Sequence, residues 1–403
     1  MVVGSEHGDW PPHGSEVVHW RQERRGGNRE DRMLSEVTTS LPPLIADLDY
    51  VVPANLTQLG ERALVALGAM DGEATGQPAA MARFMIRSES VASSKIERVS
   101  ASTEDFARAL AGQKSNSSAV SMVAASAALS TMVAAAGSRG TIERADILTA
   151  HEALMRDDLH EGPYAGRLRD SQNWIGGSDY SPRTALYVPP GHARVSELLD
   201  DLIAFANRDD LPTMAQATIA HAQFESIHPF GDGNGRTGRA LIGAILRRRG
   251  VTPHTVVPVA SGLLARRDDY FDALGSYRVG DVQPLLELML RSAVAAAEEG
   301  RVSVQRIKQF PQQWIEQADV RRASTAAALI PAFFDNPVMS IADVERTAGP
   351  VSPKLYAALT RLEDAGIIQE ITGRKRDRVW AASDLMVELE DLDSRIAAAM
   401  KQR

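Results

Sequence analysis

Apolar residues recur every three or four positions along most of this chain from Leu41 onward, which is the period of an α-helix. The pattern is clear in residues 41–72 and returns in the stretches TIERADILTAHEALM and ARVSELLDDLIAFAN. Strand-like alternation of apolar and polar residues is scarce. It occurs mainly in residues 184–188, which predict a short strand or hairpin ahead of two prolines. We therefore expect a mainly helical protein with one hairpin in its central part.

The pattern changes near residue 301 and predicts a separate C-terminal domain. A longer helical stretch is followed by two short helices, and the second has Ser352 as its N-cap, Pro353 in its first turn and Gly366 at its end. The segment IIQEITGRKRDRVWAA then reads as two strands around a glycine-containing turn. Helices followed by a hairpin are typical of a winged helix-turn-helix domain, which we expect over residues 301–403.

The rest of the chain divides into three segments. Residues 1–32 are polar, with glycine, proline and scattered charges, and predict a disordered tail. Residues 33–115 predict an N-terminal helical domain, and residues 116–300 a larger helical core. Near their boundary, the run SNSSAVSMVAASAALSTMVAAAGS is long enough to cross a bilayer. Its alanines and serines gain little in lipid, which favours a bundle helix and no membrane association.

Composition narrows the classes of chemistry. The chain is 44% hydrophobic and 24% charged, as expected for a globular protein, and its net charge of -8 argues against attraction of the whole surface to nucleic acid. It has no cysteine, which excludes disulfides, thiolate metal sites and cysteine nucleophiles. The N-terminus lacks the basic and apolar regions of a secretory signal, so we expect a cytoplasmic location.

Residues 228–239, HPFGDGNGRTGR, concentrate the chemistry of the chain. They contain the letters of a G-x-G-x-x-G dinucleotide loop, but that loop requires a preceding strand and an acid about twenty residues later. Here the preceding apolar residues fall at helical steps up to His228, and the later acid is missing. A P-loop fails because no Gly-Lys-Ser/Thr follows. A calcium loop fails because Gly243 stands where its late glutamate is needed.

A helix, a glycine-rich loop and a second helix remain, and this arrangement suits phosphate chemistry. Amides of a glycine-rich turn and of a helix N-terminus form an anion site. Arg236 and Arg239 share one face of the second helix, where they can clamp a polyphosphate. Asp232 is placed to hold Mg²⁺ against phosphate oxygens. His228 can accept a proton from an attacking hydroxyl, which points to phosphoryl or nucleotidyl transfer. We interpret His221, on the same helical face, as a packing residue.

The motif resembles the signature of the Fic family of AMP-transferring proteins throughout, and the likeness extends over residues 40–390. The resemblance implies a Fic-type helical bundle with a β-hairpin flap, using ATP and Mg²⁺ to modify a Ser, Thr or Tyr hydroxyl of a protein. It assigns His228 as the general base and Asp232 as the Mg²⁺ ligand. The implied ATP-binding and phosphate-binding residues are Gly233, Asn234, Gly235, Arg236, Thr237, Gly238 and Arg239. The related Doc kinases carry lysine in place of Gly235, so this glycine favours AMP transfer over phosphorylation.

The resemblance also implies residues outside the motif. In the segment DDYFDAL, Tyr270 and Phe271 are candidates for the adenine pocket. In the flap, the residues expected to bind the target's main chain by strand addition are Thr184, Ala185, Leu186 and Tyr187. An ordinary surface hairpin would fit the same flap sequence.

The stretch ASSKIERVS resembles the family's inhibitory motif, with Ser93 and Glu97 at the required spacing. In members whose inhibitory helix precedes the active site, the glutamate pairs with the second arginine of the motif, here Arg239. That pairing would keep Arg239 from the γ-phosphate. This chain departs from the motif at Arg98, where glycine or asparagine is expected, which questions the geometry of the helix end. The resemblance thus predicts a transferase inhibited by its own Glu97.

Two alternatives stay open at this stage. The same site could remove AMP by hydrolysis, or the Fic-like part could sense nucleotide for a DNA-binding regulator. The second alternative depends on basic residues of the predicted winged helix, namely Lys354, Arg361, Arg374, Lys375, Arg376 and Arg378. Expected partners are a protein substrate, which includes the chain itself, DNA under the second alternative, and a second copy in a homodimer.

Overall fold

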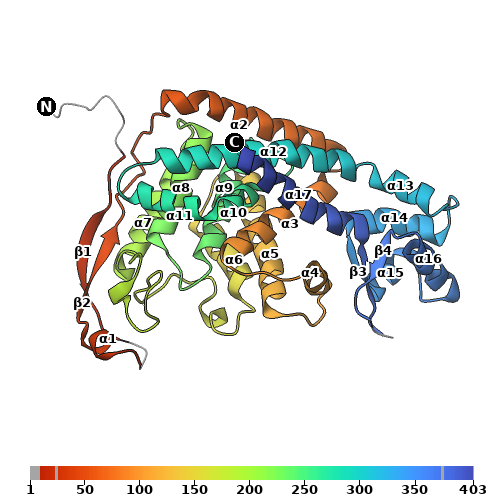
Figure 1. Cartoon of the computed structure of the whole chain (residues 1–403), viewed down its shortest axis with the longest axis horizontal. Helices are drawn as coiled ribbons and strands as arrows, with labels where there is room; N and C mark the ends of the chain where they lie inside the picture. Colours follow the sequence, from red (N-terminus) through yellow and green to blue (C-terminus); the bar gives the residue numbers. More distant parts are fainter. Residues whose placement is uncertain (1–9, 23–25, 374–375, 403) are drawn as a thin grey trace. The chain divides into compact units, whose positions relative to one another are not determined.

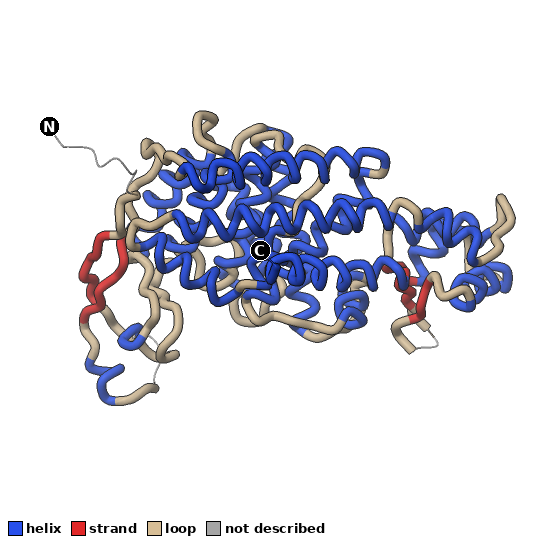
Figure 2. The backbone as a smooth tube through the Cα atoms, turned by 45° about the horizontal axis from the view of Figure 1, so that its top comes forward, coloured by secondary structure: helices blue, strands red, loops and turns tan. Residues whose placement is uncertain are grey.

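The computed structural model describes residues 10–22, 26–373 and 376–402, and the chain is mainly helical there (Figure 1). Strands are confined to a two-stranded and a three-stranded sheet within these residues, as the tube drawing also shows (Figure 2). The chain forms two compact units, each built from three stretches. The first consists of Met1–Glu61, Ala127–Val251 and Arg266–Leu290; the second of Arg62–Ser126, Thr252–Ala265 and Arg291–Arg403. Each unit combines stretches that are distant in sequence. The predicted boundaries of the segments 33–115, 116–300 and 301–403 stay predictions.

The first unit is built around helix α8 (Thr213–Ile227). Every α8 residue from Met214 to Ile227 is buried. Small residues such as Ala217 and Ala220 lie among larger apolar ones, so neighbours can approach from several sides, as expected for a helix enclosed by its own domain. Its neighbours are α7 (His192–Ala206), α9 (Asn234–Arg248) and α11 (Arg267–Arg278), and α9 also contacts α6 (Arg144–Met155).

The N-terminal region differs from the predicted disordered tail. Strands β1 (Gly14–His19) and β2 (Glu36–Leu41) pair antiparallel, with the short helix α1 (Arg29–Met33) between them in sequence (Figure 1). Trp10 is 3% exposed, and its ring lies 6.0 Å from that of Tyr50. The tail prediction is therefore wrong for the described residues up to position 32. The reason is that isolated tryptophans in a polar stretch find apolar partners far along the chain. Residues 1–9 and 23–25 lie outside the described part.

The flap, residues 174–188, has less regular structure than predicted. A single antiparallel bridge joins Ile175 to Tyr187. Thr184 ends a 3-10 turn, η3 (Pro182–Thr184), instead of starting a strand. Gly177 has a φ of 78°, and a Cβ there would lie 2.5 Å from the carbonyl oxygen of Thr184. This close approach of the two sides explains why the flap folds back as a tight loop.

In the second unit, α3 (Pro78–Ile96), α10 (Val259–Ala265) and α17 (Ser383–Gln402) pack against one another. The C-terminal part contains α14 (Thr325–Asp335), β3 (Val338–Ser340), α15 (Ile341–Ala348), α16 (Pro353–Asp364), β4 (Ile368–Glu370) and β5 (Val379–Ala382). Its sheet has the order β3-β5-β4, and α4 (Thr103–Leu110) adds Ala107 to the buried cluster on it. The predicted N-cap is confirmed, since Ser352 accepts the Leu355 amide.

The remaining helices complete the outline. They are α2 (Ala54–Glu73), α5 (Ser117–Arg139), α12 (Gln283–Ile307), α13 (Phe310–Gln317), η1 (Ala74–Gly76) and η2 (Gly162–Tyr164). Among the described residues, α5 is the one helix long and apolar enough to cross a membrane, with a mean hydropathy of 1.8. Its buried residues, such as Met122, Leu129, Met132 and Val133, recur at helical spacing, and 44% of the apolar window is buried. This matches the predicted half-buried bundle helix.

Candidate active site

His228 ends helix α8 in an unusual backbone conformation. Its φ of 51° and ψ of 61° lie in the left-handed region, which non-glycine residues rarely enter outside functional or strained sites. Its Nδ1 lies 3.4 Å from the carbonyl oxygen of Glu225. A carbonyl can only accept, so this long contact fits a ring proton on Nδ1, the tautomer in which Nε2 is the basic nitrogen. The ring is half-buried and has the character needed for a proton acceptor.

Arg169 fixes the backbone around His228. Its guanidinium donates to the carbonyl oxygens of His228 at 2.8 Å and of Pro190 at 2.5 Å, and its own amide donates to Pro229 at 2.9 Å. Further bonds reach the carbonyls of Ser171 and Ile227. The side chain is 8% exposed, and burial lowers its pKa to about 10. It is therefore a buried cation whose charge is spread over main-chain oxygens at the end of α8.

The loop after His228 is closed by amide side chains. Asn234 accepts the Phe230 amide and donates to the Phe230 carbonyl, both at 2.9 Å. Asn173 donates to the same carbonyl at 2.9 Å. Sequence reasoning assigned only the backbone amide of Asn234 to phosphate; its side chain holds the loop in shape.

The glycine-rich loop leads directly into α9, so the predicted helix–loop–helix is confirmed and the strand–loop–helix of a dinucleotide site is absent from this described segment. Gly233 is the N-cap with a φ of 74°, and a Cβ there would lie 3.0 Å from Leu154 and Met155 atoms. The following amides, including those of Asn234 and Gly235, occupy the first turn, where an α-helix offers no acceptor. Together with the helix dipole they favour an anion at this end.

Asp232 lies at the same helix end and is exposed. Its Oδ1 accepts the Gly233 amide at 2.6 Å, so the amide of Gly233, a residue predicted to bind phosphate, is already used by a carboxylate. A negative group thus sits where the helix end favours one. In the described part of the chain, no three His, Asp or Glu side chains form a group able to hold a metal alone. Mg²⁺ binds through one or two carboxylates plus substrate phosphates, and Asp232 fits that donor set.

The remaining motif residues line the first turns of α9. Arg236 is 7% exposed and Arg239 is 2% exposed, which places both cations in the interior near the loop. Gly238 faces α8, and a Cβ there would lie 2.9 Å from Phe224. The described geometry therefore gives Gly238 a packing role between the two helices. The phosphate-binding role predicted for it and for Thr237 stays a prediction.

His151 of α6 is a site residue that sequence reasoning missed. Its Nε2 donates to the carbonyl of Asp232 at 3.0 Å, and its Nδ1 accepts the Gly166 amide at 3.0 Å. Its ring stacks on Phe230 with centroids 3.7 Å apart. These partners select the Nε2–H tautomer, and burial lowers the pKa of His151 to about 4. The available signal was a histidine within the buried stripe of a predicted helix.

Acidification is expected to destabilise the protein through His151. Its folded pKa of about 4 lies below the ordinary unfolded value, so the unfolded state binds more protons between about pH 4 and 6.5, and stability falls as pH falls through that window. The full loss from this group is about 3 kcal/mol. Chemical unfolding of His151→Gln across this window should show a shallower pH dependence than the parent.

His160→Gln, the same change at an exposed histidine, is the matched control. Burial also lowers the pKa of His13 to about 4, so part of the slope persists in His151→Gln. An unaltered slope in that variant would contradict the role given to His151.

The weaker sequence assignments have mixed surroundings. Tyr270 is fully buried, and its hydroxyl lies 2.8 Å from Nε2 of His221, which supports the packing role of that histidine. Phe271 is 41% exposed, with the Arg267 guanidinium 4.8 Å from its ring centre. In the flap, Leu186 is 86% exposed, whereas Tyr187 is buried and donates to the Ser226 carbonyl at 2.7 Å. The adenine pocket and target docking stay predictions.

The end of α3 resolves the question raised by Arg98. The Arg98 amide bonds to the Lys95 carbonyl and the Val99 amide to the Ser94 carbonyl, both at 3.0 Å, which is a Schellman motif. Arg98 has a φ of 60°, the conformation that glycine or asparagine adopts most readily. The helix thus ends with the expected geometry despite the arginine. Ser93 is buried and Glu97 is the exposed C-cap.

Arg98→Gly is expected to stabilise the protein. The left-handed conformation costs a non-glycine residue about 1–2 kcal/mol, while glycine loses about 0.4–1 kcal/mol more through unfolded-state entropy. The net gain in unfolding free energy should be about 0.5–1 kcal/mol, visible as a higher denaturant midpoint. Arg98→Ala keeps the Cβ and should show little gain, so an equal gain in both variants would indicate a charge effect instead.

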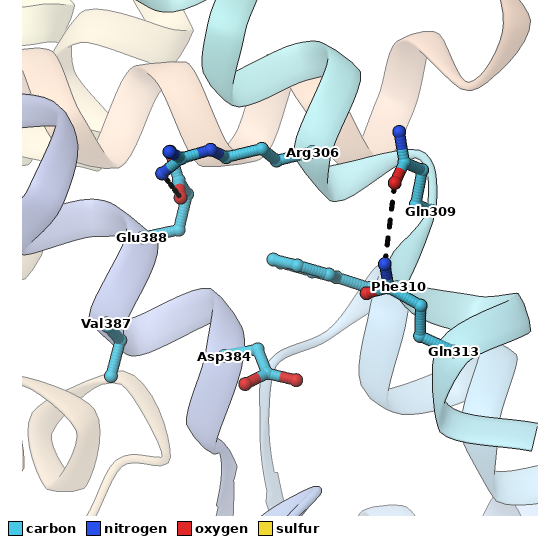
Figure 3. Close-up of a pocket in the computed structure, with 7 residues that line it drawn as sticks. All are labelled: Arg306, Gln309, Phe310, Gln313, Asp384, Val387 and Glu388. Atoms are coloured by element: carbon cyan, nitrogen blue, oxygen red, sulfur yellow. Dashed lines mark hydrogen bonds and ion pairs between the residues drawn. The ribbon is translucent and has the colours of Figure 1, made fainter. Parts of the chain in front are cut away.

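A pocket of about 240 Å³ lies in the second unit (Figure 3). Its lining residues are Arg306, Gln309, Phe310, Gln313, Asp384, Val387 and Glu388. Two of its charged residues, Arg306 and Glu388, neutralise each other in an ion pair at 3.3 Å. The pocket contains none of the predicted site residues.

The site is therefore a histidine beside a helix N-terminal anion site, on two largely buried helices, α8 and α9, that pack against each other. Residues 141–246 match the Fic/DOC family. The chain is 29% identical over 156 residues to protein adenylyltransferase fic-1 of Caenorhabditis elegans, covering 38% of this chain and 27% of that protein. It is 31% identical over 148 residues to protein adenylyltransferase Fic of Aedes aegypti, covering 36% and 26%. The matches thus span about a quarter of the length of these relatives.

Among solved structures, the chain resembles a Fic family protein from Desulfovibrio desulfuricans G20. The TM-score is 0.49 at 24% sequence identity, covering 83% of this chain and 97% of that chain.

Proposed function

We propose that this protein transfers AMP from ATP to a hydroxyl group of a protein. The observation that carries the proposal is the placement of His228 at the end of α8, held by Arg169, directly before an anion-binding helix start. The names of the two curated relatives, both protein adenylyltransferases, support the same activity.

The reaction needs one proton acceptor and a site for charged phosphates. The target's hydroxyl oxygen bonds to the α-phosphorus of ATP, and the bond from that phosphorus to the bridging β-phosphate oxygen breaks. The hydroxyl proton passes to Nε2 of His228, and pyrophosphate leaves with the electron pair. The amides at the start of α9, with Arg236 and Arg239, stabilise the phosphate charges.

Mg²⁺ is part of the proposal through Asp232, whose exposed carboxylate at the phosphate end of α9 suits a shared protein and phosphate coordination shell. Bound there, the ion would supply charge neutralisation of the polyphosphate. Asp232 would exchange its bond to the Gly233 amide for this role, leaving that amide to phosphate.

Labelled ATP tests the proposal. AMP transfer moves label from α-labelled ATP onto protein, whereas phosphorylation moves it from γ-labelled ATP. Gly235, in place of the lysine of the Doc kinases, favours the first outcome. Mass spectrometry of the acceptor, after incubation with ATP, Mg²⁺ and host lysate, then identifies the modified residue. Transfer of only the γ-label would replace the proposal with a kinase activity.

Inhibition by Glu97 belongs to the proposal as well. The Schellman end of α3 supports it, because the backbone geometry of the inhibitory motif is kept although Arg98 replaces the usual glycine or asparagine.

We propose a winged helix for the C-terminal part, supported by the succession α14, β3, α15, α16, β4 and β5. Its fitness for DNA is limited by internal pairing. Arg361 donates to the carbonyls of Ala318 and Asp319, and Arg378 lies 3.6 Å from Glu363. Lys354 and Arg376 are exposed, while Arg374 and Lys375 lie outside the described residues. Protein docking is therefore the better role for this domain.

A further inference from the structure

The N-terminal arm, the described residues within 10–41, is fixed to the first unit at its base. The Trp10 ring lies edge-on to those of Tyr50 and Phe205, with centroids 6.0 and 6.2 Å apart. The His13 amide donates to the Arg278 carbonyl at 2.9 Å. The arm then extends through β1 and β2 to α1 at their far end (Figure 1). The arm is therefore an ordered element that is anchored to the first unit through Trp10 and His13.

The far end of the arm contacts the flap through a buried hydrogen bond. The Ser181 hydroxyl donates to Oδ1 of Asp31 at 2.6 Å, and these residues are 0% and 5% exposed. The second oxygen of Asp31 accepts the Asn28 amide at 2.9 Å, so the carboxylate is fixed from both sides. The bond from Ser181 lowers the pKa of Asp31 and keeps it ionised at neutral pH. Glu30 and Arg183 add an ion pair beside it.

Aromatic and backbone contacts follow the same boundary. The rings of Trp20 and Trp174 meet edge-to-face with centroids 5.3 Å apart. A Cβ at Gly26 would lie 2.2 Å from the Tyr180 ring, so the arm's backbone approaches the flap as closely as glycine permits. The Ser40 amide of β2 donates to the Val188 carbonyl at 2.9 Å, which joins the arm to the end of the flap.

The flap has little structure of its own to hold it in place. Besides the bridge between Ile175 and Tyr187, the Trp174 indole donates to the Ser178 carbonyl and the Tyr180 amide to the Ser178 hydroxyl. The C-terminal end of the flap is tied to α8 where Tyr187 donates to the Ser226 carbonyl, two residues before His228. The stretch between, which contains Ser181, is held by the arm.

We propose that the N-terminal arm positions the flap beside His228, with Asp31 as the positioning residue that acts through Ser181. The inference rests on the proposed AMP transfer, because the flap is where an acceptor protein would be aligned. In a protein whose flap is this short of internal bonds, acceptor affinity depends on a segment that precedes the Fic domain in sequence.

Hydrogen exchange tests the hold on the flap directly. Ser181→Ala removes the hydroxyl and leaves the Asp31 cap of α1 in place. The amides of Ile175 and Leu186, both hydrogen-bonded in the flap, should exchange about tenfold faster, the loss expected for a bond to a charged group. Asp31→Asn should have a similar effect, and the double variant should add little. Ser35→Ala, an exposed hydroxyl deletion in the arm, is the matched control and should change nothing.

Kinetics then test the consequence for the acceptor. In the Glu97→Gly background, with the acceptor identified by the labelling described above, Ser181→Ala should raise the acceptor KM about tenfold, in proportion to the lost bond, and leave kcat and the ATP KM unchanged. Unchanged exchange overturns the arm's hold on the flap. Faster exchange with an unchanged acceptor KM overturns its role in docking. Absence of AMP transfer in the Glu97→Gly parent itself overturns the proposed function instead.

Discussion

His228→Ala is expected to reduce AMP transfer by about 10²–10⁴-fold, the contribution of a positioned general base. The loss should fall on kcat, since the proposed mechanism assigns ATP binding to the amides and arginines of α9, which the substitution leaves intact. The rate of label transfer from α-labelled ATP, measured in the Glu97→Gly background, gives the magnitude. Calorimetry with ATP and Mg²⁺ should show binding within a few-fold of the parent.

A matched control is available on α7. His192 is exposed at the start of that helix, and His192→Ala should retain full transfer. Transfer by His228→Ala at a rate comparable with the parent would remove the assignment of His228 as base. Loss of ATP binding together with transfer would instead indicate that the left-handed turn at His228 collapses without its side chain.

Glu97→Gly is expected to raise AMP transfer about 5- to 150-fold, the range of a typical coupling between two sites. The resemblance to the inhibitory motif implies that the carboxylate of Glu97 keeps Arg239 from the γ-phosphate and that its negative charge repels that phosphate. Removing the carboxylate releases the arginine and the repulsion together. Label incorporation from α-labelled ATP at equal protein concentration measures the gain.

The double variant Glu97→Gly/Arg239→Ala separates this route from a general loosening of the helix. If Glu97 acts through Arg239, its removal should give no gain once Arg239 is absent. Glu104→Gly removes another exposed acid of the second unit and should leave the rate unchanged. Equal labelling by wild type and Glu97→Gly would contradict the inhibitory role.

The local geometry of the site was predictable from sequence, because its signals are local. Pro229 and the glycines after it punctuate two helical stretches, and the structure has α8 and α9 on either side. Helical spacing also predicts His221 as a packing residue, which agrees with its buried bond to the Tyr270 hydroxyl. The departure from the inhibitory motif at Arg98 is local as well, because it concerns one backbone angle, the positive φ of Arg98.

Residues that act across long sequence separations were not predictable in the same way. Arg169 and His151 bind main-chain carbonyls of the loop. Every residue has a carbonyl, so such a contact requires no particular residue type at the partner position and gives no sequence signal. The arm was missed because Trp10 and Trp20 stand alone in polar surroundings and carry no period. The strand content of the flap was overestimated, because its strand-like residues form a single bridge, from Tyr187 to Ile175.

The hydrogen bonds from Arg169 to main-chain oxygens affect how the sequence around this site can change between related proteins. Because the guanidinium recognises carbonyls, the side chains at the positions that it binds, such as Ser171 and Ile227, are not chosen by that contact. The residue types at these positions can change while His228 keeps its position. A single buried cation thus lets the turn at His228 keep its backbone position while the side chains around it change.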